Sequence, residues 1–179
     1  MFKRFLLLMA AASVLSACSS NPCEQGRTND CVIHRAKLQM KLAKQQVNMV
    51  KTAKGTLIVI PSDELFETGS DEVTSIGRYT QYFLWKYIQS YPKANISVHA
   101  YTDTVLPPKN AKALTQAQAR EVAGYLWAYG VPNQTQTLSY KGMGTKRPVS
   151  SNRYFTGMAN NRRVEVFIKP NCCQQRGKF

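Results

Sequence analysis

The sequence lacks an apolar run long enough to span a bilayer. Its only strongly apolar run covers residues 5–14, about half of the roughly 20 residues that a membrane-spanning helix needs. Glycine and proline are scarce, at 10 and 8 of 179 residues, and 44% of the residues are hydrophobic, which excludes collagen-like repeats and intrinsic disorder. The chain is therefore not a polytopic membrane protein, and its length suits one small domain with extensions.

Acidic residues and histidines are also few. There are 10 Asp and Glu against 24 Lys and Arg, and the net charge of +14 favours an anionic partner such as a polymer, a membrane surface or an acidic protein face. The two histidines lie in unrelated segments, and no nucleophile accompanies a base in a recognisable motif. We therefore predict that the protein is not an enzyme.

The N-terminus has the organisation of a secretion signal. Two cationic residues at 3–4 precede the apolar run, which ends at Leu15-Ser16-Ala17-Cys18. Small residues before a cysteine resemble the lipobox of bacterial lipoproteins, so we expect a signal peptide over 1–17 and acylation of Cys18. Ser19, rather than an Asp that would resemble a retention signal, favours the outer membrane, with the domain in the periplasm. The alternative is an ordinary signal peptide, but in either case export removes nucleic acid as the usual partner of a basic chain.

Four further cysteines lie near the two ends of the expected mature chain. They are Cys23, Cys31, Cys172 and Cys173, an even number in a compartment that permits disulfides. Three kinds of disulfide pairing are possible: a loop closed between the first two cysteines, bridges from the N-terminal segment to the tail, or a strained bond between the adjacent pair. A zinc site is disfavoured because only His34 lies nearby and the spacings match no zinc ribbon or finger. No metal or other cofactor is expected.

Composition divides the remainder of the chain into four parts. Residues 18–30 lack periodicity and read as a tether, and residues 31–52 read as a basic amphipathic helix. This helix either packs on the domain with its lysines solvated or docks on anionic headgroups or a partner protein. Residues 55–170 form the expected domain, and residues 171–179 form a tail that contains cysteine.

The domain shows alternating strand and helix patterns. Strands are predicted at residues 56–60, 95–101, 135–141 and 163–168, and helices at residues 71–91 and 111–129. This order predicts an α/β (α+β) sandwich, with a mixed four-stranded sheet and helices on one face. In the first of these helices, apolar residues at three- and four-residue steps are expected in the core: Ile76, Tyr79, Phe83, Leu84, Tyr87, Ile88 and Tyr91. Tyr82 and Trp85 lie off this stripe and are candidates for contact with the N-terminal helix or with another protein.

Five blocks of the domain resemble the OmpA-like C-terminal domain, in order and spacing. They are Leu65-Phe66-Glu67-Thr68-Gly69-Ser70, Ala100-Tyr101-Thr102-Asp103, Leu114-Thr115 with Ala119 and Val122, Gly142-Met143-Gly144 with Pro148, Ser151 and Asn152, and Gly157-Met158-Ala159-Asn160-Asn161-Arg162-Arg163-Val164-Glu165. The resemblance implies the OmpA-like fold and non-covalent binding of the peptide stem of cell-wall peptidoglycan. Lipidated proteins of this kind include peptidoglycan-associated lipoprotein and a lipoprotein subunit of type IVB secretion systems.

The resemblance also implies a binding site. Diaminopimelate in the stem carries an ammonium and a carboxylate on one stereocentre, and the family Asp that takes the ammonium corresponds to Asp103. The Arg that usually holds the carboxylate is replaced by Gln118, fifteen positions later, so Lys109, Lys112 or Arg162 are candidates to supply the lost charge. The other residues that retain family-like chemistry near the groove are Glu67, Thr102, Asn161 and Arg162, the last two as possible braces of a loop.

Two functions are therefore consistent with the sequence. In the first, the protein binds peptidoglycan and links the outer membrane to the cell wall. In the second, it is a structural subunit of an envelope assembly such as a type IVB secretion system, which uses the fold for protein contacts and has weakened peptidoglycan binding. The second function is favoured by Gln118, by Ala111 in place of a family Asn, by the aromatic residues Tyr82 and Trp85, and by the basic helix.

Overall fold

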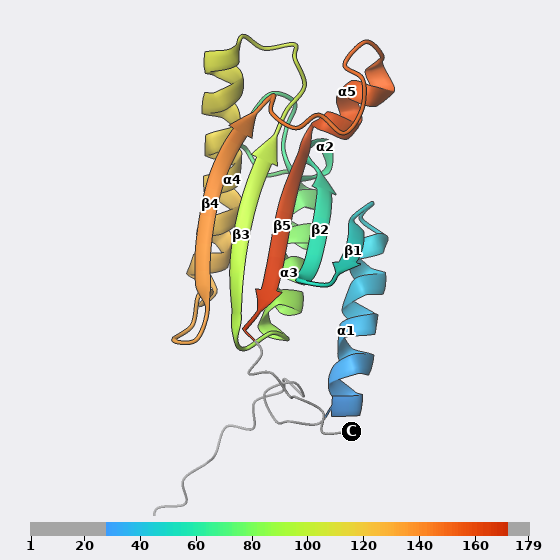
Figure 1. Ribbon diagram of the computed structural model, residues 1–179, viewed down its shortest axis with the longest axis vertical. Helices are drawn as coiled ribbons and strands as arrows, with labels where there is room; N and C mark the ends of the chain where they lie inside the picture. Colours follow the sequence, from blue (N-terminus) through green and yellow to red (C-terminus); the bar gives the residue numbers. More distant parts are fainter. Residues whose placement is uncertain (1–27, 172–179) are drawn as a thin grey trace, which may run out of the picture.

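The computed structural model describes residues 28–171 and places one sheet against a layer of helices (Figure 1). The strands are β1 (Asn48–Thr52), β2 (Gly55–Pro61), β3 (Ala94–Tyr101), β4 (Thr137–Gly144) and β5 (Arg163–Pro170). The helices are α1 (Thr28–Ala43), α2 (Ser62–Leu65), α3 (Ser75–Gln89), α4 (Pro108–Ala128) and α5 (Phe155–Asn161). The predicted fold class, a mixed sheet with helices packed on one face, is confirmed.

The sheet has five strands in the order β1-β2-β5-β3-β4 rather than the four that we predict. The pair β3–β4 is parallel and the other pairs are antiparallel. The additional strand is β1, which forms a hairpin with β2 in which Thr52 pairs with Gly55. The expected helix over 31–52 is therefore wrong in its second half, because α1 ends at Ala43, and the expected tether over 18–30 is wrong at its end, because α1 begins at Thr28.

The core lies between the sheet and helices α3 and α4. Alternate residues of β2, Thr56, Ile58 and Ile60, are buried on the helix side, as expected for a strand with one covered face. In α3 the buried stripe consists of Gly77, Thr80, Gln81, Leu84, Tyr87 and Ile88. The expected burial of Ile76 and Tyr79 is wrong, because these side chains are 51% and 67% exposed.

Helix α1 packs against the C-terminal end of α3. Its buried residues include Leu38 and Leu42, while Arg35 donates from Nε to Ser90 Oγ (3.0 Å) and from Nη2 to the Ser90 carbonyl. The Arg35 guanidinium also lies over the ring of Tyr91, 3.9 Å from its centroid. A cation at a helix C-terminus complements the exposed carbonyls and the helix dipole, so α1 is held by charge as well as by apolar contact.

The N-terminal and C-terminal expectations fall mainly outside the described residues. These include the signal peptide, the acylated Cys18, the tail, and the candidate disulfide partners Cys23, Cys172 and Cys173. Cys31 begins the buried face of α1 and is disulfide-bonded. Within residues 28–171, no helix combines the length and the apolar character that a membrane span requires, and no three His, Cys, Asp or Glu side chains are grouped to hold a metal ion.

Candidate functional site

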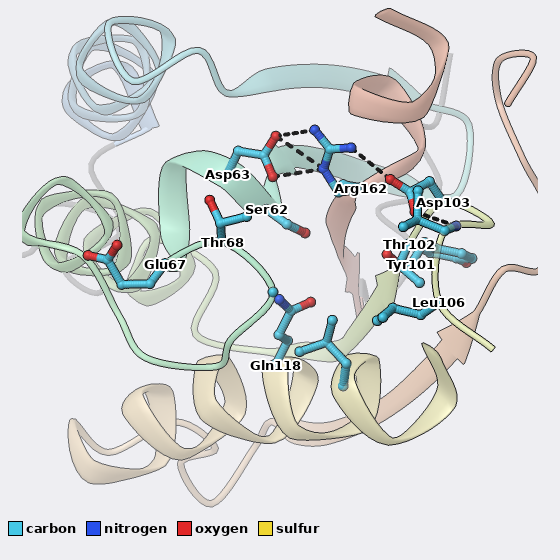
Figure 2. Close-up of a pocket in the computed structure, with 13 residues that line it drawn as sticks. Ser62, Asp63, Glu67, Thr68, Tyr101, Thr102, Asp103, Leu106, Gln118 and Arg162 are labelled. Carbon is cyan, nitrogen blue, oxygen red and sulfur yellow. Dashed lines mark hydrogen bonds and ion pairs between the residues drawn. The ribbon is translucent and has the colours of Figure 1, made fainter. Parts of the chain in front are cut away.

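A pocket of about 320 Å³ lies where β3 ends, beside α2 and the N-terminal half of α4 (Figure 2). Its walls come from segments that are distant in the sequence. They are Ser62, Asp63, Glu67, Thr68, Gly69, Tyr101, Thr102, Asp103, Val105, Leu106, Leu114, Gln118 and Arg162. The pocket therefore combines an apolar wall from the 105–106 loop and α4 with a cluster of charged groups on its other side.

Asp103 is the buried acid of this pocket. It is the second residue after the end of β3, and its side chain is only 5% exposed. Its Oδ1 accepts a hydrogen bond from the backbone N–H of Val105 (3.0 Å), and its Oδ2 accepts one from Arg162 Nη1 (2.7 Å). Asp103 thus caps the turn that leaves the strand and also holds charge in the pocket. A carboxylate has about four lone-pair sites, so both oxygens retain capacity for a ligand.

Arg162 joins Asp103 to a second acid, Asp63. Arg162 donates from Nη2 to Asp63 Oδ2 (2.7 Å) and from Nε to Asp63 Oδ1 (2.9 Å), the two-pronged geometry that guanidinium forms with carboxylate. The hydrogen bonds to Asp63, and the single one to Asp103, raise the pKa of Arg162 against the opposing effect of burial. The cluster of Asp63, Arg162 and Asp103, called the ion cluster below, has one more carboxylate than cations.

Sequence reasoning misses Asp63, which lies 99 residues from Arg162 along the chain. Strand pairing explains their approach: Pro61 at the end of β2 pairs with Arg163 at the start of β5, so the residues just beyond these ends face each other. The Ser62 N–H donates to the Arg162 carbonyl (3.0 Å), and this fixes the crossing. No local pattern around Asp63 indicates such a role; only the strand order reveals it.

Gln118 lies on the pocket face of α4 and is buried. Its Nε2 donates to the carbonyl of Ser70 (2.8 Å), and so ties α4 to the loop that includes Glu67, Thr68 and Gly69. Figure 2 shows the Gln118 amide between this loop and Leu106. One of its two N–H groups is therefore occupied by the protein itself.

Of the other predicted site residues, Thr102 and Glu67 line the pocket and Asn161 does not. Thr102 is buried in the pocket wall, and Glu67 lines the pocket but directs its carboxylate away from the ion cluster (Figure 2). Asn161 does not line the pocket: its Oδ1 accepts from the N–H groups of Val149 (2.8 Å) and Ser150 (3.1 Å), and it braces that loop.

The lysines that could replace a missing positive charge are not in the pocket wall. Lys112 donates from Nζ to the carbonyl of Gly142, and neither Lys109 nor Lys112 lines the pocket. Ser62, which sequence reasoning also misses, contributes a buried Oγ that has no hydrogen-bond partner among the described residues. Buried hydroxyls are usually hydrogen-bonded, so this oxygen is suited to contact a polar ligand.

Residues 65–162, more than half of the chain, match the model of the OmpA family, and the chain belongs to this family. It is similar to the probable lipoprotein YiaD of Escherichia coli, with 28% identity over 138 residues that cover 77% of this chain and 62% of that protein. It is also similar to the peptidoglycan-binding protein ArfA of Mycobacterium tuberculosis, with 32% identity over 45% of this chain and 24% of ArfA. The chain thus matches less than two thirds of the length of either relative.

The fold is also that of a solved domain. The periplasmic domain of Helicobacter pylori MotB superimposes with a TM-score of 0.61 and 26% identity, over 70% of this chain and 89% of that domain. The expected OmpA-like architecture is therefore confirmed both by sequence and by structure.

Proposed function

We propose that the protein is a non-catalytic, lipid-anchored envelope protein whose OmpA-family domain binds the peptide stem of peptidoglycan. The anchor is the acylated Cys18, which holds the chain in the outer membrane and leaves the domain in the periplasm to link this membrane to the cell wall. The names of two relatives, a probable lipoprotein and a peptidoglycan-binding protein, support the proposal. The observation that carries it is the buried Asp103 carboxylate in an open pocket.

The pocket matches the ammonium group of diaminopimelate. Asp103 and Asp63 provide two carboxylates for one guanidinium, so the ion cluster has an excess negative charge that an ammonium group neutralises. Hydrogen bonds between ionised groups are roughly twice as strong as neutral ones, and the buried position of Asp103 reduces screening by water. The apolar side chains of Leu106 and Leu114 provide the opposite wall for the methylene chain of the ligand.

Sedimentation of the purified full-length chain with isolated sacculi tests this function. In Asp103→Asn, Oδ1 still accepts from the Val105 N–H, so the turn is retained while the charge is removed. We expect the affinity for sacculi to fall by about tenfold or more. Glu121→Gln is the matched control, because it removes one charge from an exposed position of α4 outside the pocket wall.

The assay requires physiological salt, because the net charge of +14 otherwise promotes non-specific binding to an anionic polymer. Reduced binding of Asp103→Asn, with normal binding of Glu121→Gln, supports the proposal. Equal binding of Asp103→Asn and the unaltered chain contradicts it.

A second function, as a structural subunit of an envelope assembly such as a secretion system, is favoured by one surface. Tyr82 and Trp85 of α3 adjoin Tyr129, which follows α4: the rings of Tyr82 and Trp85 are 5.7 Å apart, and those of Trp85 and Tyr129 are 5.1 Å apart. Tyr82 and Tyr129 remain 42% and 49% exposed, and Trp127 is 74% exposed. Aromatic side chains are enriched at protein interfaces, so recovery of a stoichiometric envelope protein after crosslinking supports this function. Recovery of the chain alone counts against it.

A further inference from the structure

We propose that the pocket prefers a stem peptide in which the diaminopimelate carboxyl beside the free ammonium is amidated over one in which it is a free carboxylate. This inference rests on the proposed function and specifies the ligand of the same site. It follows from the donors, acceptors and charges that the pocket presents to a group placed beside the bound ammonium.

The pocket has no uncommitted cation for a carboxylate. Among the described residues that line it, Arg162 is the only cationic side chain. All three of its nitrogens already donate to carboxylates of the protein: Nη1 to Asp103, and Nε and Nη2 to Asp63. A ligand carboxylate would be the third carboxylate around this one guanidinium, whose charge Asp63 and Asp103 already balance. A carboxamide, which is neutral, adds no further negative charge.

Gln118 presents the hydrogen-bonding pattern that complements a carboxamide. Because the Ser70 carbonyl can only accept, the group of Gln118 that faces it must be the NH₂, and Oε1 is left to face elsewhere. The free capacity of Gln118 is thus one acceptor and one N–H donor. A primary amide can donate to the first and accept from the second. A carboxylate has no donor, so it leaves Oε1 opposite another lone pair.

The charge of the surrounding residues also favours the amidated ligand over the free carboxylate. The ion cluster has an excess negative charge, and Glu67, although its carboxylate points away from the cluster, adds a further acid to the lining. The ammonium group of the ligand gains from this potential, whereas an adjacent carboxylate loses part of that gain by repulsion. Amidation keeps the attraction and removes the repulsion.

Calorimetric titration of the full-length chain with two stem tripeptides tests the preference. The peptides differ only at this carboxyl of diaminopimelate, which is either a free carboxylate or a primary amide. We expect the amidated peptide to bind about tenfold more tightly or better. Gln118→Arg should abolish or reverse this difference, because it introduces a cation into the wall. Ala113→Arg, which adds the same charge at an exposed position of α4 outside the wall, should leave the difference unchanged.

The outcomes separate this inference from the proposed function. A tighter amidated peptide, with the preference lost in Gln118→Arg alone, supports both. Equal affinities, or tighter binding of the free acid, overturn the amide preference and leave peptidoglycan binding intact, since both peptides then still bind. Binding of neither peptide overturns the proposed function and the inference with it.

Discussion

At the residue scale, the ion cluster has two unequal halves. The side chain of Asp103 is 5% exposed, whereas that of Asp63 is 49% exposed, and Arg162 lies between them at 33%. Removal of a partner from a buried carboxylate leaves a charge that water solvates poorly, but a charge near the surface is readily solvated. The two contacts of Arg162 should therefore contribute differently to stability.

We predict that Arg162→Ala lowers the free energy of unfolding by about 1–3 kcal/mol, since it leaves Asp103 buried without its cation. Asp63→Ala should cost less than about 1 kcal/mol, because Arg162 keeps Asp103 and the lost pair is partly exposed. Urea denaturation of both variants measures the difference. Equal losses would show that the two carboxylates are equivalent to the fold.

His99 gives a second prediction at this scale. It lies on the sheet face opposite the helices, paired across the strands with Glu165 and Lys141. Burial lowers the pKa of His99; Glu165 opposes this effect, while Arg147 and Lys141 add to it. Because the pKa of an unperturbed histidine is about 6.5, the unfolded chain binds a proton at His99 more readily than the folded chain does.

The contribution of His99 to stability is accordingly present above the unfolded pKa and is lost as the pH falls through the folded value. We expect the loss of unfolding free energy between about pH 7.5 and pH 5.5 to be smaller in His99→Gln than in the unaltered chain. Denaturation curves at both pH values test this. Carboxylate titration is common to the two proteins, so an identical loss in both would exclude a role for His99.

At the scale of elements, the position of α4 depends on a close approach to β4. A Cβ atom at Gly142 would lie 2.2 Å from the backbone nitrogen of Gln116, so any larger residue would push the helix from the sheet. Gln118 lies on α4, and Asp103 lies just after β3, which is the neighbour of β4 in the sheet. The contact between α4 and β4 therefore also sets the width of the pocket. Gly124, exposed on the same helix, has nothing within 4 Å of its Cβ position.

Gly142→Ala should therefore destabilise the protein by about 2 kcal/mol or more through overpacking. Gly124→Ala should stabilise it by about 0.5–1 kcal/mol, because alanine is the better helix former. Thermal or urea unfolding of the pair measures both effects with the same chemical change. Similar effects at the two positions would mean that α4 has room to move away from β4.

The elements also show where sequence reasoning succeeds. The strand β2 is predicted by its compact β-branched run and the strand β5 by its strict apolar alternation. The strand β1 is not, since its residues are mostly exposed and their Gln- and Lys-rich surroundings favour helix; pairing with β2 decides its conformation. The predicted core face of α3 is confirmed at Leu84, Tyr87 and Ile88 but is wrong in the first two turns, where Thr80 and Gln81 are buried and the more apolar Ile76 and Tyr79 are exposed.

At the scale of the whole molecule, the site is non-local and its charge differs from that of the chain. The family resemblance points to Asp103, Gln118 and Arg162, because these residues belong to or are counted from its blocks. Asp63 is unpredictable from any segment, since only the antiparallel pairing of β2 with β5 brings it to Arg162. A net charge of +14 likewise suggests an anionic ligand, but the pocket holds more acids than bases. The overall charge is therefore suited to attract an anionic polymer, and the pocket to bind a cationic group within it.

The most direct test of the central claim, that the peptide stem binds beside Asp103 and Gln118, is an NMR titration of the ¹⁵N-labelled full-length chain with each stem tripeptide. We expect shifts of the Val105 backbone amide, which donates to Asp103, and of the Gln118 side-chain amide. The side-chain amide of Gln136, which donates to the Tyr91 carbonyl and is not part of the pocket wall, should remain in place. Unchanged Val105 and Gln118 signals at saturating peptide would show that the stem does not bind in this pocket.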